Sequence, residues 1–209
     1  MTPLSADQKD AIGEIFTVAI NRSASVLSAM IGEEVVLTVP DVHFVPLSEA
    51  AVQLAEKSEA NCCAVRQNFG GPISGQSWLV FPAAKSLELV RSVLDEFDAL
   101  HDMTELDQDA VSEVGNVVLN RCLSTLANEL GLKFDVSLPE LFNGNTRNAL
   151  LPNPPHDEEI QPWPQDGDDQ FTILIDVRFD IDVRDITGPI MIIVHIGSVG
   201  GHLTGAFTK

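Results

Sequence analysis

The sequence predicts an α/β (α+β) domain made of two copies of one unit, each contributing a long helix and strands to one mostly antiparallel sheet. Three observations predict this fold. Residues 10–41 align without a gap with residues 109–140, at an offset of 99 positions. Each copy begins with a long helical pattern, and strand patterns bounded by Gly and Pro follow it. We therefore expect a single domain over 1–209, with pseudo-two-fold repeats over about 5–100 and 104–209.

The two copies are more similar than two unrelated amphipathic helices would be. Ten of the 32 aligned positions are identical, whereas average residue usage predicts about two. Several of the identities are polar, and amphipathicity alone does not dictate polar identities. The identical pairs are Asp10/Asp109, Ala11/Ala110, Glu14/Glu113, Val18/Val117, Asn21/Asn120, Arg22/Arg121, Ser25/Ser124, Leu27/Leu126, Gly32/Gly131 and Pro40/Pro139.

Both long helices have recognisable ends. In each copy a Ser or Thr precedes the helical pattern and an acceptor side chain follows three residues later, which is the spacing of a capping box. Gly32 and Gly131 stand where a left-handed residue commonly closes a helix. We therefore expect helices over 6–31 and 105–130. The expected capping pairs are Ser5 with Gln8 and Thr104 with Asp107.

Short strands are expected directly after both helices, over 35–39 and 134–138. Each is expected to end at a proline, Pro40 or Pro139, because proline cannot donate a hydrogen bond to a strand ladder. In the first copy the remaining elements follow from periodicity and turn residues. They are a helix over 47–57, a strand near 62–69, a turn at Gly70-Gly71-Pro72, a strand over 77–81 and a helix over 83–97.

The second copy contains two further strands. Residues 171–183 alternate between apolar and polar side chains, which predicts a strand with one buried face. Residues 190–196 are nearly all apolar and predict a central strand. An insertion within 143–169 has five prolines and, after His156, six acids and no base. We expect it to be a flexible acidic, proline-rich loop.

The composition excludes several classes of function. The chain has 31 acids and 12 bases, a formal net charge of −19 at pH 7, which opposes binding to nucleic acid and to anionic membranes. No apolar run has the roughly 20 residues of a membrane helix, and no signal peptide is recognisable, so we expect a cytoplasmic protein. The three cysteines and five histidines have no metal-ligand spacing, so we expect no metal site.

The best candidate for a functional site is a polar stripe on the second long helix. Asp109, Glu113, Asn116 and Asn120 are spaced i, i+4, i+7 and i+11, so they share one face of the helix. A solvated helix face is the alternative interpretation. Asn is an unusual choice for such a face, because its amide hydrogen-bonds to nearby backbone groups and thereby disfavours the helix. The matching stripe in the first copy consists of Asp10, Glu14, Thr17 and Asn21.

The stripe resembles the signature of a known family. Asp109-x-x-x-Glu113-x-x-Asn116, followed after 22 residues by Pro139, resembles the motif of the CheC/CheX/FliY group of chemotaxis phosphatases. The run Glu113-Val114-Gly115-Asn116 is similar to the Glu-Ile-Gly-Asn of that group. The first copy has the same frame, with Thr17 in the place of the expected Asn. The two-copy layout is CheC-like, and the resemblance extends over most of the chain, except for 143–169 and the shortened end of the second copy.

The resemblance implies a phosphatase that acts on the aspartyl phosphate of a CheY-like response regulator. It implies that the helix lies on the receiver domain, that Asn116 orients the attacking water, and that Glu113 holds the helix in register through a receiver lysine. Asp109 and Asn120 are candidate supporting residues. The Mg²⁺ of the reaction would belong to the receiver, so no intrinsic cofactor is implied. In the first copy the residues of a degenerate site would be Asp10, Glu14 and Thr17.

A non-catalytic module of the same fold is the second hypothesis. Such a module would bind a receiver, a flagellar-motor protein or another signalling partner through the same helix. The amide of Asn116 separates the two hypotheses, because catalysis needs it and binding does not. Neither hypothesis fixes the oligomeric state, and the sequence is compatible with a monomer and with a homodimer paired through an exposed sheet edge.

Overall fold

The structure combines long helices with an antiparallel sheet, as the sequence predicts. The computed structural model describes residues 5–57, 61–82, 104–145, 171–181 and 186–199. The helices within these residues are α1 (Ala6–Ile31), α2 (Leu47–Lys57) and α4 (Glu105–Leu130). The strands are β1 (Val35–Val45), β2 (Asn61–Gly70), β3 (Ile73–Pro82), β4 (Asp135–Val136), β5 (Glu140–Asn145), β6 (Phe171–Ile181) and β7 (Ile186–Val199).

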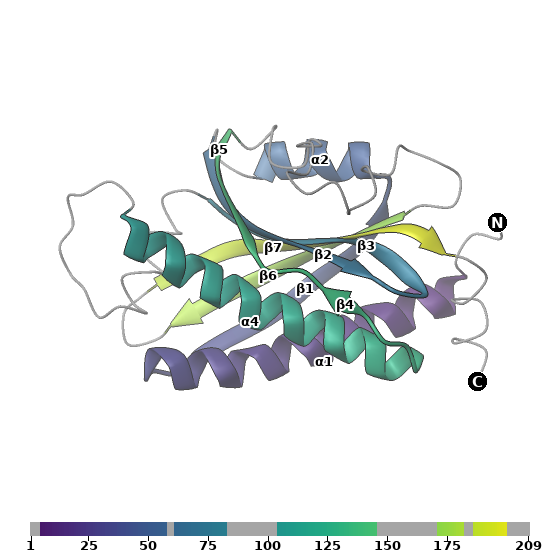
Figure 1. Cartoon of the computed structure of the whole chain (residues 1–209), viewed down its shortest axis with the longest axis horizontal. Coiled ribbons are helices and arrows are strands. Elements are labelled where there is room, and N and C mark those ends of the chain that lie inside the picture. Colours follow the sequence, from purple (N-terminus) through teal and green to yellow (C-terminus); the bar gives the residue numbers. More distant parts are fainter. Residues whose placement is uncertain (1–4, 58–60, 83–103, 146–170, 182–185, 200–209) are drawn as a thin grey trace.

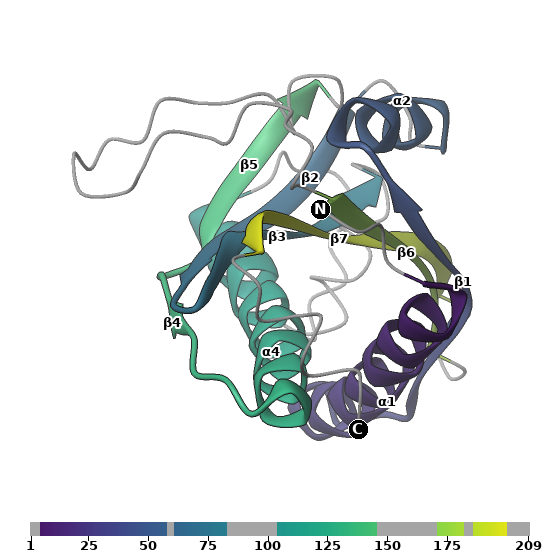
Figure 2. The same ribbon diagram turned by 90° about the vertical axis from the view of Figure 1, so that its right-hand side faces the viewer.

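The described elements form three layers. The sheet is the middle layer, and α1 and α4 lie side by side on one of its faces (Figure 1). Figure 2 shows α2 on the opposite side of the sheet from the two long helices. The main apolar core lies between the sheet and the two long helices, because both helices bury apolar side chains against it.

The two long helices begin and end at the predicted residues. Before α4, Thr104 Oγ1 accepts a hydrogen bond from Asp107 N at 3.2 Å, and Asp107 Oδ2 accepts one from Thr104 N at 2.7 Å. The matching capping box precedes α1. Gly32 and Gly131 close the helices with φ of 76° and 64°, a left-handed conformation that strains most side chains. The helix predicted over 47–57 is confirmed as α2.

The strands follow the order β1-β6-β7-β3-β2-β4, and β5 also pairs with β2. The central strand predicted over 190–196 is confirmed, because β7 lies between β6 and β3. Equivalent strands in the two halves share one register. Asp41 pairs with Asp176, and Glu140, which lies 99 positions after Asp41, pairs with Arg66. These registers are consistent with the predicted duplication.

The strands predicted over 35–39 and 134–138 are wrong in their ends. β1 continues through Pro40 to Val45, and its register to β6 shifts between residues 38 and 41. On the other edge, β4 has two residues and β5 starts directly after Pro139. Proline removes one N–H from the ladder, so it interrupts an edge strand locally, and pairing with the neighbouring strand resumes beyond it.

The other strands of the first copy are confirmed, and β5 corrects one loop boundary. β2 and β3 cover the strands predicted near 62–69 and over 77–81, and β3 starts earlier, at Ile73. β5 includes residues 143–145, which were predicted to open the loop, because they pair with β2. The rest of that loop, the helix predicted over 83–97 and the residues after 199 lie outside the described residues.

The long alternating strand is confirmed as β6 over its described residues, but its polar face is partly buried. Thr172 and Leu174 lie on that face, and both are fully buried. Leu174 belongs to a small apolar cluster with Trp78 and Val80, on the face of the sheet away from the long helices. α2 also contacts β6. The face becomes solvated only further along, where Arg178 is exposed.

Cys122 of α4 is a buried thiol in the main core. Burial raises the pKa of its thiol from 9.0 to about 12, because an apolar interior disfavours the charged thiolate. In the unfolded chain the thiol ionises near its ordinary pKa. The contribution of Cys122 to stability is therefore complete below pH 9 and is lost as the pH rises towards 12.

We predict that Cys122 makes the folded protein less stable in alkaline solution. The free energy of unfolding should fall by about 1 kcal/mol through this thiol alone between about pH 8 and pH 10. Urea titrations at both pH values measure the fall. In Cys122→Ala, the fall over the same interval should be smaller by that amount. An equal fall in both proteins would contradict the prediction.

Candidate functional site

The predicted polar stripe lies along the outer side of α4. Asp109 and Glu113 are exposed, and Asn116 and Asn120 are half-buried. Within the described residues, the carboxylates of Asp109 and Glu113 make no ion pair and no hydrogen bond. The stripe therefore combines two carboxylates that are available to a partner with two amides that contact the protein.

The amide of Asn116 is held through its oxygen. Asn116 Oδ1 accepts one hydrogen bond from Gln67 Nε2 at 3.1 Å and another from Asn120 Nδ2 at 2.6 Å. Because a carbonyl oxygen has two lone pairs, its accepting capacity is used. Asn116 Nδ2 makes no hydrogen bond within the described part of the chain. The oxygen is thus fixed while the N–H₂ group stays available.

Gln67 reaches Asn116 from the sheet. It lies on the face of β2 that packs against the long helices, and its exposed fraction is 1%. The helix lies close to this face at Gly115, where a Cβ atom would be 2.5 Å from the side chain of Val65. The missing side chain at Gly115 therefore lets α4 lie close enough to β2 for Gln67 to bond Asn116.

Ser137 is the second partner of Gln67. Gln67 Nε2 donates to Ser137 O at 3.3 Å. The position of Ser137 is fixed on β2, because its N donates to Asn68 O at 2.9 Å and its Oγ accepts from Asn68 N at 3.0 Å. The four residues of the site thus come from α4, β2 and the segment between β4 and β5: they are Asn116, Asn120, Gln67 and Ser137, and Ser137 contributes its backbone carbonyl.

The stripe of the first copy is arranged differently. Asp10 and Glu14 are exposed on α1, but Thr17 Oγ1 donates to Gly13 O of its own helix at 2.9 Å. At the 99-residue offset, Phe16 stands in the place of Gly115 and is fully buried. The hydroxyl proton is therefore used within the helix, and a buried aromatic ring stands where α4 has a glycine in close contact with β2.

The strand facing the first-copy helix also lacks the amide. Asp41 pairs with Asp176 of β6, and Glu140, its equivalent in the other copy, pairs with Arg66 of β2. Arg66 and Asp176 are therefore equivalent, and so are the residues that follow them. Val177 of β6 is thus the counterpart of Gln67. It is buried in the main core. The first copy has a Thr and a Val where the second copy has Asn116 and Gln67.

A groove with a volume of about 710 Å³ opens beside Asn116. It lies between α4 and residues 132–136, and Asn120, Arg121 and Lys133 are among its lining residues. Arg121 and Lys133 are exposed and form no ion pair within the part of the chain that the structure describes. The groove therefore has two positive charges among its lining residues, together with the carboxylate of Asp135, in a chain whose net charge is −19.

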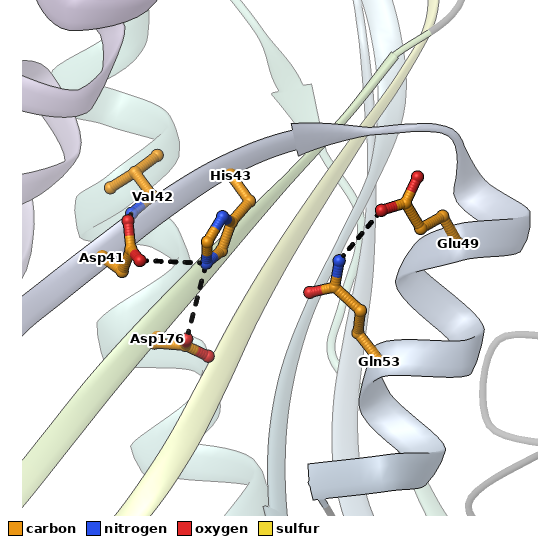
Figure 3. A network of polar contacts seen from close by, with 6 residues as sticks. All are labelled: Asp41, Val42, His43, Glu49, Gln53 and Asp176. Atoms are coloured by element: carbon orange, nitrogen blue, oxygen red, sulfur yellow. Dashed lines mark hydrogen bonds and ion pairs between the residues drawn. The ribbon is translucent and has the colours of Figure 1, made fainter.

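A second group of polar side chains lies at the β1 edge of the sheet. Figure 3 shows His43 Nε2 between Asp41 Oδ2, at 3.2 Å, and Asp176 Oδ2, at 3.8 Å. Asp41 Oδ1 accepts from the backbone N of Val42 at 2.9 Å. The described residues contain no group of three or more His, Cys, Asp or Glu side chains that could hold a metal ion. We therefore interpret this group as a cross-strand contact between β1 and β6.

Sequence reasoning found the helical residues of the site but missed Gln67 and Ser137. A signal for Gln67 is present in the sequence of β2. Cys63, Val65 and Phe69 occupy alternate positions of a buried face, and Gln67 is the polar residue within that series. A polar side chain on a buried strand face needs a partner, and this need points towards a contact with a helix.

The chain is similar in sequence to a flagellar protein over 140 residues. No family model matches the chain. The flagellar motor switch phosphatase FliY of Bacillus subtilis (strain 168) is 26% identical over 140 residues, which make up 66% of this chain and 36% of that protein. This chain therefore matches little more than a third of the length of that relative.

The fold is found in solved structures of the same group. FliY of Thermotoga maritima has a TM-score of 0.70 and 17% identity to this chain, over 99% of this chain and 96% of that chain. The predicted resemblance to the CheC/CheX/FliY group is confirmed. A chain of the FliG–FliM complex from H. pylori has a TM-score of 0.66 and 10% identity, over 96% of this chain and all of that chain. No described helix of this CheC-like fold is long and apolar enough to cross a membrane.

Proposed function

We propose that this chain binds a CheY-like receiver domain through α4 and accelerates hydrolysis of its aspartyl phosphate. The observation that carries the proposal is the amide of Asn116, whose oxygen accepts two hydrogen bonds while its Nδ2 has no partner within the described residues. Such an amide is rigid and still available to a partner. The name of the B. subtilis relative, a motor switch phosphatase, supports the same activity.

In the proposed reaction the phosphatase has to contribute little besides the position of a water molecule. An aspartyl phosphate is a reactive acyl phosphate, so the main task is to position water in line with the leaving oxygen. The N–H₂ group of Asn116 would donate to that water and hold its oxygen near the phosphorus atom. An amide adds no negative charge beside the phosphoryl oxygens, whereas a carboxylate at the same place would repel them. The Mg²⁺ would be held by the receiver.

The surroundings of Asn116 suit an anionic reaction centre. Glu113 lies one turn earlier on α4 and is exposed, so its carboxylate is available to a lysine of the receiver. Arg121 and Lys133 line the neighbouring groove, and their positive charges favour the approach of a phosphoryl group. Asn120 supports Asn116 directly through its 2.6 Å hydrogen bond, while Asp109 extends the exposed acidic face of the stripe.

Binding without catalysis is a second candidate function. It is favoured by the first copy, where Thr17 has its hydroxyl bonded within its own helix. It is also favoured by the fold that the chain shares with a chain of the FliG–FliM complex. In this case α4 would bind a receiver, a motor protein or another signalling partner, and Asn116 would contribute only to the interface.

Phosphate release separates the two functions. A CheY-like receiver from the same genome is charged with acetyl phosphate, and phosphate release is followed with increasing amounts of the full chain. Acceleration in proportion to the chain supports the phosphatase. Receiver binding in a titration without acceleration supports the binding module and contradicts the phosphatase. If the chain neither binds the receiver nor accelerates release, both receiver-based functions are contradicted.

A further inference from the structure

The amide of Asn116 has two ends of similar shape and opposite chemistry. Its oxygen accepts hydrogen bonds and its nitrogen donates them. Rotation of the amide by half a turn exchanges the two ends and would present an acceptor, instead of a donor, to a bound partner. The function proposed for Asn116 therefore depends on a residue that fixes the orientation of its amide.

We propose that Gln67 is a positioning residue that holds Asn116 Oδ1 towards the protein and Nδ2 towards a partner. The consequence for turnover rests on the proposed phosphatase function, whereas the orientation itself rests on the hydrogen bonds of the free protein. Gln67 Nε2 donates to Asn116 Oδ1 at 3.1 Å, and Asn120 Nδ2 donates to the same oxygen at 2.6 Å.

The carbonyl of Ser137 decides the orientation of the whole chain of amides. A backbone carbonyl can only accept, so Gln67 has to turn Nε2, and not Oε1, towards Ser137 O at 3.3 Å. The same nitrogen carries a second proton, and this proton points to Asn116. Asn116 therefore has to present its oxygen to Gln67. Through Gln67, the carbonyl of Ser137 thus fixes which end of the Asn116 amide faces the protein.

A role in packing does not account for Gln67. Its Oε1 is buried and has no hydrogen-bond partner within the described residues, and an unpaired buried acceptor disfavours the folded state. The equivalent residue of the other half is Val177, which is 2% exposed. The other half of the sheet therefore accepts an apolar side chain at the equivalent position. Of the two copies, the one with Asn116 has the Gln side chain, as expected if Gln67 positions Asn116.

Gln67→Met tests the role in turnover. Methionine keeps the length of the side chain but donates no hydrogen bond. We expect turnover of the phosphorylated receiver to fall by about 10- to 100-fold, by analogy with residues that orient metal ligands through hydrogen bonds. The Kd for the receiver and the Tm should change little. Unchanged turnover, or a loss that is explained by weaker receiver binding, overturns the proposal.

Gln76→Met is the matched control. Gln76 of β3 also has a buried Oε1 without a partner among the described residues. Its neighbour Ser77 pairs with Gln67, so these two side chains lie on the same face of the sheet. Gln76 therefore lies on the opposite face, away from Asn116. This variant should keep the turnover of the wild type. An equal loss in both variants would indicate a general effect on the sheet and would overturn the proposal.

Side-chain amide exchange tests the orientation without a receiver. In the free wild-type protein, the Nε2 protons of Gln67 are buried and bonded, so their ¹⁵N–¹H signals should persist as the pH is raised. The Nδ2 protons of Asn116 should exchange with water and lose their signals first. The reverse order overturns the proposal. This measurement stays decisive if the wild type has no phosphatase activity, because that result would contradict only the proposed function.

Discussion

Asn116→Ala should lower the turnover of a phosphorylated receiver by about 10²- to 10³-fold, which is the usual effect of removing one donor aimed at a reacting group. The receiver should still bind with a nearly unchanged Kd, because the exposed carboxylates of Asp109 and Glu113 remain on the same face of α4. The variant loses the N–H₂ group and leaves Gln67 with Ser137 as its partner. Phosphate release and a binding titration, done with the same receiver, measure the two effects separately.

Two further variants show whether the lost donor is the cause. Asn116→Asp keeps an oxygen that can accept from Gln67 and Asn120, but it replaces the outward N–H₂ group by a second oxygen. It should fold normally and be as slow as Asn116→Ala. Thr17→Ala changes the equivalent residue of the first copy, whose hydroxyl is bonded to Gly13 O, and should keep full turnover. Full turnover in Asn116→Ala would place the reactive site elsewhere.

The helices were predictable to the residue because their signals are local. Each capping box joins residues three positions apart, and each terminal glycine adopts its left-handed conformation next to the helix that it closes. The polar stripe of α4 is local in the same sense, since residues i, i+4 and i+7 share a face of one helix. Stretches of one or two helical turns thus carry the information that fixes these features.

The ends of the edge strands were not predictable from local signals. Pro40 interrupts β1, but the strand continues because Asp41 to Val45 pair with β6, more than 120 positions away in the sequence. In the same way, β5 forms beyond Pro139 because β2 offers it a partner. Proline chemistry correctly predicted an interruption at both places. Whether a strand resumes afterwards depends on the neighbouring strand, which periodicity does not reveal.

Gln67 shows the same limit at the candidate site. It is 49 positions from Asn116 and 70 from Ser137, so the three residues meet only when the sheet forms. Its polar side chain within a buried strand face is a visible anomaly, but the sequence does not say which helix provides the partner. The partner is determined by how closely α4 approaches β2. That approach depends in turn on Gly115, where no Cβ separates the two backbones.

The close approach of α4 to β2 leads to the second large expected effect. Gly115→Ala should lower both stability and turnover, because the new Cβ would lie 2.5 Å from Cβ and Cγ1 of Val65. Overpacking of this kind typically costs about 1–3 kcal/mol, which exceeds the gain of up to about 1 kcal/mol expected for alanine in a helix. To relieve the contact, α4 has to move away from β2, and the hydrogen bond between Gln67 and Asn116 has to stretch. A displacement of about 1 Å in a reacting group commonly costs about 100-fold in rate.

Gly13→Ala provides the matched control for this effect. Gly13 also lies within a long helix, but the nearest side-chain atoms to its added Cβ belong to Val42 and are 3.9 Å away, which is an ordinary contact. This variant should raise the free energy of unfolding by about 0.5–1 kcal/mol through helix propensity alone and leave turnover unchanged. Urea titrations and phosphate release on both variants measure the contrast. The contrary outcome is a Gly115→Ala variant that is stabilised like Gly13→Ala and keeps its turnover. In that case the close approach at Gly115 does not position Asn116, and the spacing between α4 and β2 has no part in the proposed reaction.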